Sequence, residues 1–345
     1  MKLRIRSLAG VLLFILPSRA ATANTQGSLD TPPLPPPGRL VDIGGWRLHL
    51  NCTGRAGTGN PTVILEAGAG DFSVEWSLVQ PEVTRFARVC SYDRAGDGWS
   101  DLGPHPRTFH QIAYELHTLL ERAGEPPPFV LVGHSYGGWL VRLYQSMYPA
   151  EVVGLVLVEA GADNPLRMMP DGKLVRVLDL PAGQPVPPVQ TSHPLRESEI
   201  PPGALGQIKS GREEASVHAN DPPRDLLPLP AQRMRTWTLG RVGHVVAAVN
   251  PFDTEELVAL HAESVKSEHP LGDLPLVVLT RGVPEEEGPD GRAREEEHRR
   301  DHAFLAALSR KGKQVIAAKS GHHIQLQEPG LVVTAIQEVV GAVHH

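Results

Sequence analysis

The sequence predicts an α/β protein with a mostly parallel sheet of about eight strands and helices on both faces. Short apolar runs of strand length alternate with helical patterns, and an antiparallel pair opens the series. A Gly-x-Ser-x-Gly pentapeptide stands between a buried apolar run and a helix in the middle of the chain. Such alternation indicates a parallel sheet, because the connection between two parallel strands is usually a helix.

Length and charge limit the classes of function. The 345 residues can form one large domain with insertions or two domains, and a hydrophobic content of 41% is enough for a sizeable core. The net charge of -6 gives no reason to expect nucleic acid or an acidic membrane surface as a partner.

The first 23 residues predict a signal peptide. A basic start at residues 2–6 precedes an apolar stretch at 8–16 that is too short to span a bilayer, and residues 21–23 fit the small-x-small cleavage rule. We expect export to a periplasm or to the exterior, with no stable membrane insertion after cleavage. An uncleaved N-terminal anchor is the alternative. Residues 24–38 then form a stiff, proline-rich linker.

The expected strands are short and bounded by turn residues. The first two form an antiparallel pair around Gly44-Gly45, and the third ends in a loop with few side chains, residues 67–70, which lets backbone N–H groups approach a ligand. Residues 93–101 follow the fourth strand and are expected to form a structural turn tied by Asp–Arg contacts. The strands are expected at residues 40–43, 46–52, 62–66, 89–92, 129–132, 152–158, 276–279 and 315–318.

Apolar spacing and end signals predict the helices. Thr108 and Gln111 form a capping box, and Gly124 ends the helix that they begin. Pro149 ends the helix that follows the pentapeptide. The expected helices cover residues 76–87, 108–124, the stretch from the pentapeptide to Pro149, 295–308, and a last helix whose apolar face spans 332–343.

A helical cap is expected between two parts of the core. Residues 39–163 and 269–345 keep the strand–helix rhythm, whereas residues 164–268 lose it and are dense in proline. Only two stretches of this segment look helical, near residues 204–218 and 254–267. The segment carries too many apolar residues for a disordered linker. We therefore expect it to be inserted after the sixth strand and to lie over the site.

The pentapeptide Gly133-His134-Ser135-Tyr136-Gly137 predicts a nucleophile elbow. A serine on such a sharp strand-to-helix turn is held in a strained backbone conformation with its hydroxyl above the sheet. Side chains at positions 133 and 137 would collide with neighbouring backbone, and the N-terminus of the next helix favours a developing negative charge. The alternative is a glycine-rich turn with an incidental serine.

A serine nucleophile needs a base and an acid from other strand ends. His322 follows the last strand and is the expected base, whereas its neighbour His323 would point elsewhere. The acid that orients the imidazole has two main candidates. Glu159 follows the sixth strand, and Glu285 lies in the acidic loop after the seventh.

These residues resemble the α/β-hydrolase superfamily over nearly all of the chain after the linker, apart from the cap. The marks are residues 132–138, 91–101, 155–159 and 320–322. The resemblance implies the chain order nucleophile, acid, histidine. It also implies an oxyanion hole made by the N–H groups of Tyr136 and Ala69. The loop of Ala69 usually begins His-Gly in this superfamily, and here it reads Ala67-Gly68.

The resemblance also bears on the acid. Most members place it after the seventh strand, where Glu285 stands, but some, including certain haloalkane dehalogenases, place it at the end of the sixth, where Glu159 stands. The seventh strand here lacks the usual Asp, and residues 285–287 look like a solvated acidic run. We favour Glu159, with Glu285 as the alternative acid and Asp163 as a further one.

The resemblance implies that Cys52 and Cys90 lie on neighbouring strands, so that they could form a disulfide. Two buried free thiols are the alternative. His298 and His302 are one helical turn apart, but their charged neighbours indicate a solvated face rather than a metal site. We expect no metal and no cofactor.

The sequence thus predicts an exported serine hydrolase that cleaves small carboxylic esters through Ser135, His322 and an acid. Amide or lactone hydrolysis, acyl transfer and cofactor-free peroxidase activity share the same elbow. A ligand-binding protein that kept the fold without catalysis is the alternative of another class. The oligomeric state is not predicted.

Overall fold

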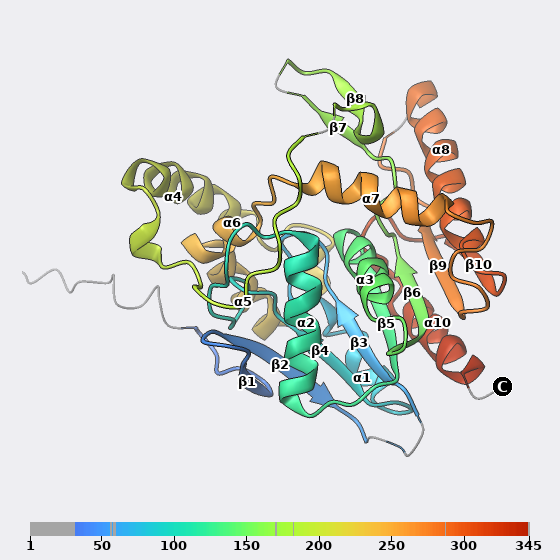
Figure 1. Ribbon diagram of the computed structural model, residues 1–345, viewed down its shortest axis with the longest axis horizontal. Helices are drawn as coiled ribbons and strands as arrows, with labels where there is room; N and C mark the ends of the chain where they lie inside the picture. Colours follow the sequence, from blue (N-terminus) through green and yellow to red (C-terminus); the bar gives the residue numbers. More distant parts are fainter. Residues whose placement is uncertain are drawn as a thin grey trace, which may run out of the picture. The chain divides into compact units, whose positions relative to one another are not determined.

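The computed structural model describes residues 32–343 except residues 56, 58, 59, 170, 182 and 287. The predicted signal peptide and most of the predicted linker lie outside the described residues. The sheet has eight strands in the order β1-β2-β4-β3-β5-β6-β9-β10, and its six strands from β4 to β10 run parallel (Figure 1). The predicted fold class is confirmed.

The strands are mostly buried apolar runs, as the sequence predicts. β2 pairs antiparallel with both β1 and β4, and all other neighbours pair in parallel. The strands of this sheet are β1 (Arg39–Asp42), β2 (Arg47–Thr53), β3 (Thr62–Glu66), β4 (Val89–Tyr92), β5 (Phe129–His134), β6 (Val152–Val158), β9 (Leu276–Arg281) and β10 (Gly312–Ala317).

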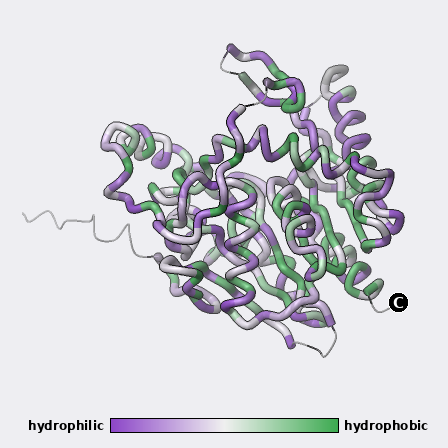
Figure 2. The backbone as a smooth tube through the Cα atoms, viewed as in Figure 1, coloured by the Kyte–Doolittle hydropathy of each residue, from purple (hydrophilic) through white to green (hydrophobic). Residues whose placement is uncertain are grey.

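Alternate side chains of the central strands enter two separate cores. Ile64 and Leu131 pack on one face with α2 (Phe109–Ala123), α3 (Tyr136–Met147) and α8 (Gly288–Ala307). Val63 and Val130 pack on the other face with α1 (Gln80–Val83) and α10 (Pro329–Ala342). Figure 2 shows the central strands as mostly hydrophobic and α8 as mostly hydrophilic. The short helix α9 (Ile324–Gln327) precedes α10.

The segment between β6 and β9 supplies the cap elements. Two cap helices, α5 and α7, contribute residues to small apolar clusters that also contain core residues. The cap elements are β7 (Leu166–Met168), β8 (Leu174–Arg176), η3 (Val177–Asp179), η4 (Glu197–Glu199), α4 (Pro202–Val217), η5 (Arg224–Leu226), α5 (Leu229–Leu239), α6 (Val242–Ala247) and α7 (Asp253–Val265). Among the helices of the described residues, none is both long and apolar enough to cross a bilayer.

Three local predictions differ from the structure. The helix predicted at residues 76–87 is a 3₁₀ turn, η2 (Ser73–Trp76), followed by the single turn α1. Pro81 explains the difference, because proline fits only the first turn of a helix and so α1 begins beside it. Helices α5 and α6 were not predicted, and α8 begins seven residues before the predicted start at 295.

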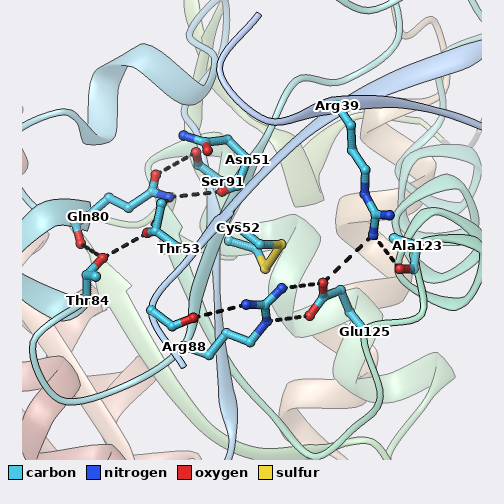
Figure 3. The surroundings of a disulfide bond; sticks show 12 residues. Arg39, Asn51, Cys52, Thr53, Gln80, Thr84, Arg88, Ser91, Ala123 and Glu125 are labelled. Atoms are coloured by element: carbon cyan, nitrogen blue, oxygen red, sulfur yellow. Dashed lines mark hydrogen bonds and ion pairs between the residues drawn. A yellow bond between two sulfur atoms is a disulfide. The ribbon is translucent and has the colours of Figure 1, made fainter. Parts of the chain in front are cut away.

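A disulfide links the antiparallel edge to the parallel part of the sheet. Cys52 of β2 and Cys90 of β4 are direct register partners with a Cα–Cα distance of 4.0 Å, and they are bonded. Figure 3 shows polar contacts on both sides of this bond, including the pair of hydrogen bonds from Arg88 to Glu125. Glu125 is buried, and this pair of hydrogen bonds fixes the loop before β5 to Arg88, the residue that precedes β4.

Removal of the disulfide should destabilise the protein. The bond closes a loop with a sequence separation of 38 residues. Chain-entropy arguments then give a loss of about 4 kcal/mol or less in the free energy of unfolding. We expect this loss for the double variant Cys52→Ser, Cys90→Ser, measured by urea unfolding. A reducing agent should destabilise the native protein but not the double variant. Equal stability of the two proteins under oxidising conditions would contradict the prediction.

Candidate active site

Ser135 occupies a strained turn between β5 and α3. Its φ is 51° and its ψ is -117°, a conformation that residues with a side chain rarely adopt. The glycines around it are sterically required. A Cβ at Gly133 would lie 2.4 Å from the Gly137 carbonyl oxygen, and a Cβ at Gly137 would lie 2.7 Å from the carbonyl oxygen of Glu66. The turn therefore has the geometry expected of a nucleophile elbow.

The loop after β3 lies beside the elbow and is held by one arginine. Arg94 is buried and donates hydrogen bonds to the carbonyl oxygens of Ala67, Gly68 and Asp71 at 2.6–3.0 Å. It also pairs with the buried carboxylate of Glu66 at 2.6 Å. Because these carbonyl groups are turned towards Arg94, the loop is fixed in one conformation. Arg94 belongs to the segment predicted as a structural turn, but its contacts are mainly with this other loop.

The two residues predicted to form the oxyanion hole line one small cavity. Ala69 and Tyr136 border a cavity of about 40 Å³, room for about three water molecules. Tyr136 is the first residue of α3, so its N–H has no partner within the helix. The cap closes the cavity with Ala247 and Ala248. The two residues of the predicted oxyanion hole therefore border one cavity, next to the elbow in the chain.

Cap helix α6 is tied to the loop that carries Arg94. Nδ1 of His244 lies 2.7 Å from Oδ1 of Asp97, and Asp97 lies 3.6 Å from Nε of Arg94. Arg241 donates a hydrogen bond to the carbonyl oxygen of Gly98 at 2.8 Å. The contacts run from the cap, through the loop after β4, to the loop after β3.

A second cap helix, α5, is held by buried ions. Arg235 donates a hydrogen bond to Asp71 at 2.8 Å and also pairs with Glu75. Arg224 approaches Asp71 at 3.3 Å. Burial opposes ionisation of Asp71, but Arg235 and Arg224 outweigh it and hold the pKa of Asp71 below its usual range. Burial and the nearby Asp71 raise the pKa of Glu75 to about 8.

His322 lies in the loop after β10, close to the elbow. Its ring centroid is 5.0 Å from that of His134, and its backbone carbonyl oxygen is 3.0 Å from Nε2 of His134. Burial, followed by the charge of His322, lowers the pKa of His134 to about 4. His134 is therefore neutral near pH 7 and can donate its Nε2 proton to His322 O. The residue before the serine thus fixes the loop of the expected base.

Glu159 directly follows β6, and its carboxylate is buried beside His322. Its Oε1 lies 3.9 Å from Nδ1 of His322. The residue is in a left-handed conformation with φ 45°, and its N–H donates to the carbonyl oxygen of Leu279 at 2.8 Å. Burial opposes ionisation of Glu159, but contacts with His298 and His322 outweigh it and hold the pKa of Glu159 well below its usual range. Glu159 therefore stays an anion and could orient an imidazole.

The alternative acids have other partners. The side chain of Glu285 is 54% exposed and pairs with Arg281 at 3.1 Å. Asp163 is buried against Arg142, at 2.5 Å. The exposure of Glu285 and the strong pairing of Asp163 favour Glu159 as the acid.

Arg281 was not singled out from the sequence. The face of His298 and His302 was predicted to be solvated, and this is wrong, because His302 is fully buried and the side chain of His298 is only 18% exposed. Arg281 is the last residue of β9, and its guanidinium lies 2.8 Å from Oε1 of Glu159. Nε2 of His298, on α8, also lies 2.8 Å from this oxygen. The missing acid at the end of β9 was visible in the sequence and could have suggested that an arginine there serves the carboxylate on β6.

Among the described residues, two groups of side chains outside the disulfide have the composition of a metal site. Glu159, His298 and His302 form one group, and Asp71, His134 and His323 form the other. Both ring nitrogens of His302 are within 2.9 Å of protein oxygens, from Thr280 and Ala160. Asp71 is already paired with two arginines. Protein contacts therefore account for both groups.

Comparisons with known proteins agree with this architecture. Residues 63–335 match the model of the α/β hydrolase family. An AB hydrolase superfamily protein from Gibberella zeae is 25% identical over 290 residues, 81% of this chain and 86% of that protein. A probable transporter from Hormonema carpetanum is 35% identical over 136 residues, 38% of this chain, and the match spans only 20% of that longer protein. A thermophilic esterase from Thermogutta terrifontis has a similar fold, with a TM-score of 0.57 and 17% identity over 89% of this chain and 99% of the esterase.

The chain belongs to the α/β hydrolase family, and membership of this family makes it a hydrolase. The likeness to the esterase shows the fold alone.

Loosening of the loop after β3 should slow turnover. Arg94→Lys keeps the charge, but one ammonium cannot hold three carbonyl groups in the place of a guanidinium. We expect kcat on a p-nitrophenyl ester to fall roughly ten- to a hundredfold, with little change in KM, because the N–H of Ala69, the predicted oxyanion donor, is no longer held in place.

Arg47→Lys is the matched control. Arg47 pairs with Asp101 in the loop after β4, and its side chain is 54% exposed. This control should keep the native kcat. A folded Arg94→Lys variant with native kcat would show that the clamp has no part in turnover.

Proposed function

We propose that the protein is an exported serine hydrolase that cleaves small carboxylic esters. The observation that carries the proposal is the meeting of three strand ends. Ser135 stands on the strained elbow after β5, Glu159 directly follows β6, and His322 follows β10 with Nδ1 3.9 Å from Glu159 Oε1. Serine, imidazole and carboxylate in this order form the set used for acyl transfer.

The proposed reaction begins with proton transfer. Nε2 of His322 takes the proton of the Ser135 hydroxyl, which then attacks the ester carbonyl carbon. The N–H groups of Tyr136 and Ala69 stabilise the oxyanion. His322 gives the proton to the departing alcohol, and an acyl-enzyme on Ser135 is left. Water, activated by the same histidine, releases the acid.

Glu159 has the part of orienting His322 and stabilising its charged form. At 3.9 Å the two groups are beyond hydrogen-bond distance. They must approach each other by about 1 Å to form the bond that holds the imidazole tautomer. Catalytic hydrogen bonds are often long before substrate binds.

Export is a separate part of the proposal. It is supported by the signal-like sequence at residues 1–23 and by the Cys52–Cys90 disulfide, which is compatible with an oxidising compartment.

The nucleophile is tested directly by substitution. Ser135→Ala should abolish turnover of p-nitrophenyl esters, and it should also prevent labelling by a fluorophosphonate probe, because both need the serine oxygen. Ser146→Ala, on the same helix and away from the elbow, should keep native activity and labelling. If the native protein is folded and is not labelled, a non-catalytic ligand-binding role on this fold is the better interpretation.

The acid is tested by a pair of matched variants. Glu159→Gln should lower kcat by orders of magnitude, up to about 10⁴-fold, because a neutral amide no longer stabilises the imidazolium. Glu285→Gln should change kcat by less than about twofold, since an exposed ion pair contributes little. If the pH-independent kcat fell by orders of magnitude in Glu285→Gln and stayed native in Glu159→Gln, Glu285 would be the acid of the triad.

A further inference from the structure

Two imidazoles, those of His298 and His322, lie near the carboxylate of Glu159. His298, which is not part of the proposed triad, is the nearer of the two. Oε1 of Glu159 lies 2.8 Å from Nε2 of His298 and 3.9 Å from Nδ1 of His322. A guanidinium nitrogen of Arg281 is also 2.8 Å from Oε1. The other oxygen, Oε2, accepts a hydrogen bond from the backbone N–H of Arg281 at 2.7 Å.

These contacts crowd one oxygen atom. A carboxylate oxygen offers about two lone-pair sites, and Arg281 and His298 both stand 2.8 Å from Oε1. His322 can therefore reach Oε1 only if His298 moves back. Nε2 of His298 is buried and makes no aligned hydrogen bond. Its contact with Glu159 is therefore one of proximity, and protonation of the imidazole would add a charge to it.

We propose that His298 is a positioning residue that competes with His322 for Glu159, so that protonation of His298 separates Glu159 from His322. This inference rests on the proposed function, because it assigns a role relative to the triad. It adds a residue of α8 to the proposed mechanism. This residue controls the fraction of enzyme molecules in which Glu159 is hydrogen-bonded to His322.

The neighbouring histidine on α8 does not take the same part. The rings of His298 and His302 are 4.2 Å apart, but His302 is fully buried. Nδ1 of His302 lies 2.8 Å from Oγ1 of Thr280, and Nε2 lies 2.9 Å from the carbonyl oxygen of Ala160. His302 is thus committed to the core, whereas the side chain of His298 is 18% exposed.

The charges around His298 favour a grip on Glu159 when the imidazole is protonated. Glu159 faces it from the end of β6, and Glu295 and Asp301 act on it from α8. Arg281, from β9, is the opposing cation. A second positive charge 2.8 Å from the buried carboxylate strengthens the attraction, because charges in a buried site are poorly screened.

The consequence is a loss of activity towards low pH that involves two histidines. As pH falls, protonation of His322 removes the base, and protonation of His298 draws Glu159 away. Glu159 itself stays ionised and adds no step. The acid limb of log kcat/KM should therefore approach a slope of about two in the native enzyme.

Two variants at position 298 test this inference. His298→Phe keeps a ring but removes the donor, and His298→Gln places an uncharged amide N–H near the former Nε2. We expect both to lower the acid slope from about two to about one. His298→Phe should also exceed the native enzyme in kcat/KM at the acid end. The fluorophosphonate labelling rate of Ser135 should follow the same pH dependence, which gives a readout independent of deacylation.

His218→Gln is the control, because His218 is an exposed cap histidine that also contacts a carboxylate, Asp221. It should keep the native slope. Folded variants at 298 that keep the native slope would overturn the inference, and so would a loss of kcat at all pH values in His298→Phe. In either case Ser135-dependent turnover of the native enzyme would leave the proposed function intact. Absence of that turnover in the native enzyme would overturn both.

Discussion

The strained, positive-φ backbone of Ser135 is the constraint on which the site depends. Such a conformation costs on the order of 1–3 kcal/mol and persists only where the surroundings enforce it. The N–H of Ser135 donates to the carbonyl oxygen of Val158 at 3.0 Å, and its carbonyl oxygen accepts from the N–H groups of Gly138 and Gly161. The elbow is thus tied to its own helix and to the end of β6. Because β5 is central in the sheet, the neighbouring strand ends can supply the rest of the site.

A second residue with a positive φ, Glu159, follows the neighbouring strand β6. Its N–H donates to Leu279 of β9, while its carboxylate accepts from the N–H of Arg281. Arg281, the last residue of β9, brings a cation to the carboxylate of Glu159 at the end of the neighbouring strand. This pairing explains why Glu159 can be ionised although it is buried, since a buried charge needs a partner.

The site residues predicted from sequence are those that short-range patterns define. Apolar runs place the strand ends, and parallel topology brings these ends together, so Ser135, Glu159 and His322 could be chosen before any coordinates. The disulfide pairing, by contrast, was implied by the resemblance to the α/β-hydrolase superfamily, in which the second and fourth strands are neighbours, and the structure contains this bond. The partners of Arg94 and His298 could not be predicted, because a charged residue in a loop or on a polar helix does not reveal which distant group it meets.

The cap was the least predictable part. Helices α5 and α6 begin after Pro228 and Arg241 without a capping side chain, and so they lack the usual start signal. Their positions depend on contacts with the core. Arg235 of α5, for example, is buried between Asp71 and Glu75, residues that are remote in the sequence.

Asp71 joins the cap to the loop that carries Ala69. Its backbone carbonyl oxygen accepts from Arg94 at 3.0 Å, and its carboxylate accepts from Arg235 at 2.8 Å. Movement of α5 away from the core would leave the carboxylate of Asp71 buried without Arg235, its nearest cation. Loss of one partner of a buried ion pair costs about 3–5 kcal/mol. The position of the cap and the conformation of the loop are therefore not independent. A change in α5 that alters the pocket also acts, through Asp71, on the backbone that would stabilise an oxyanion.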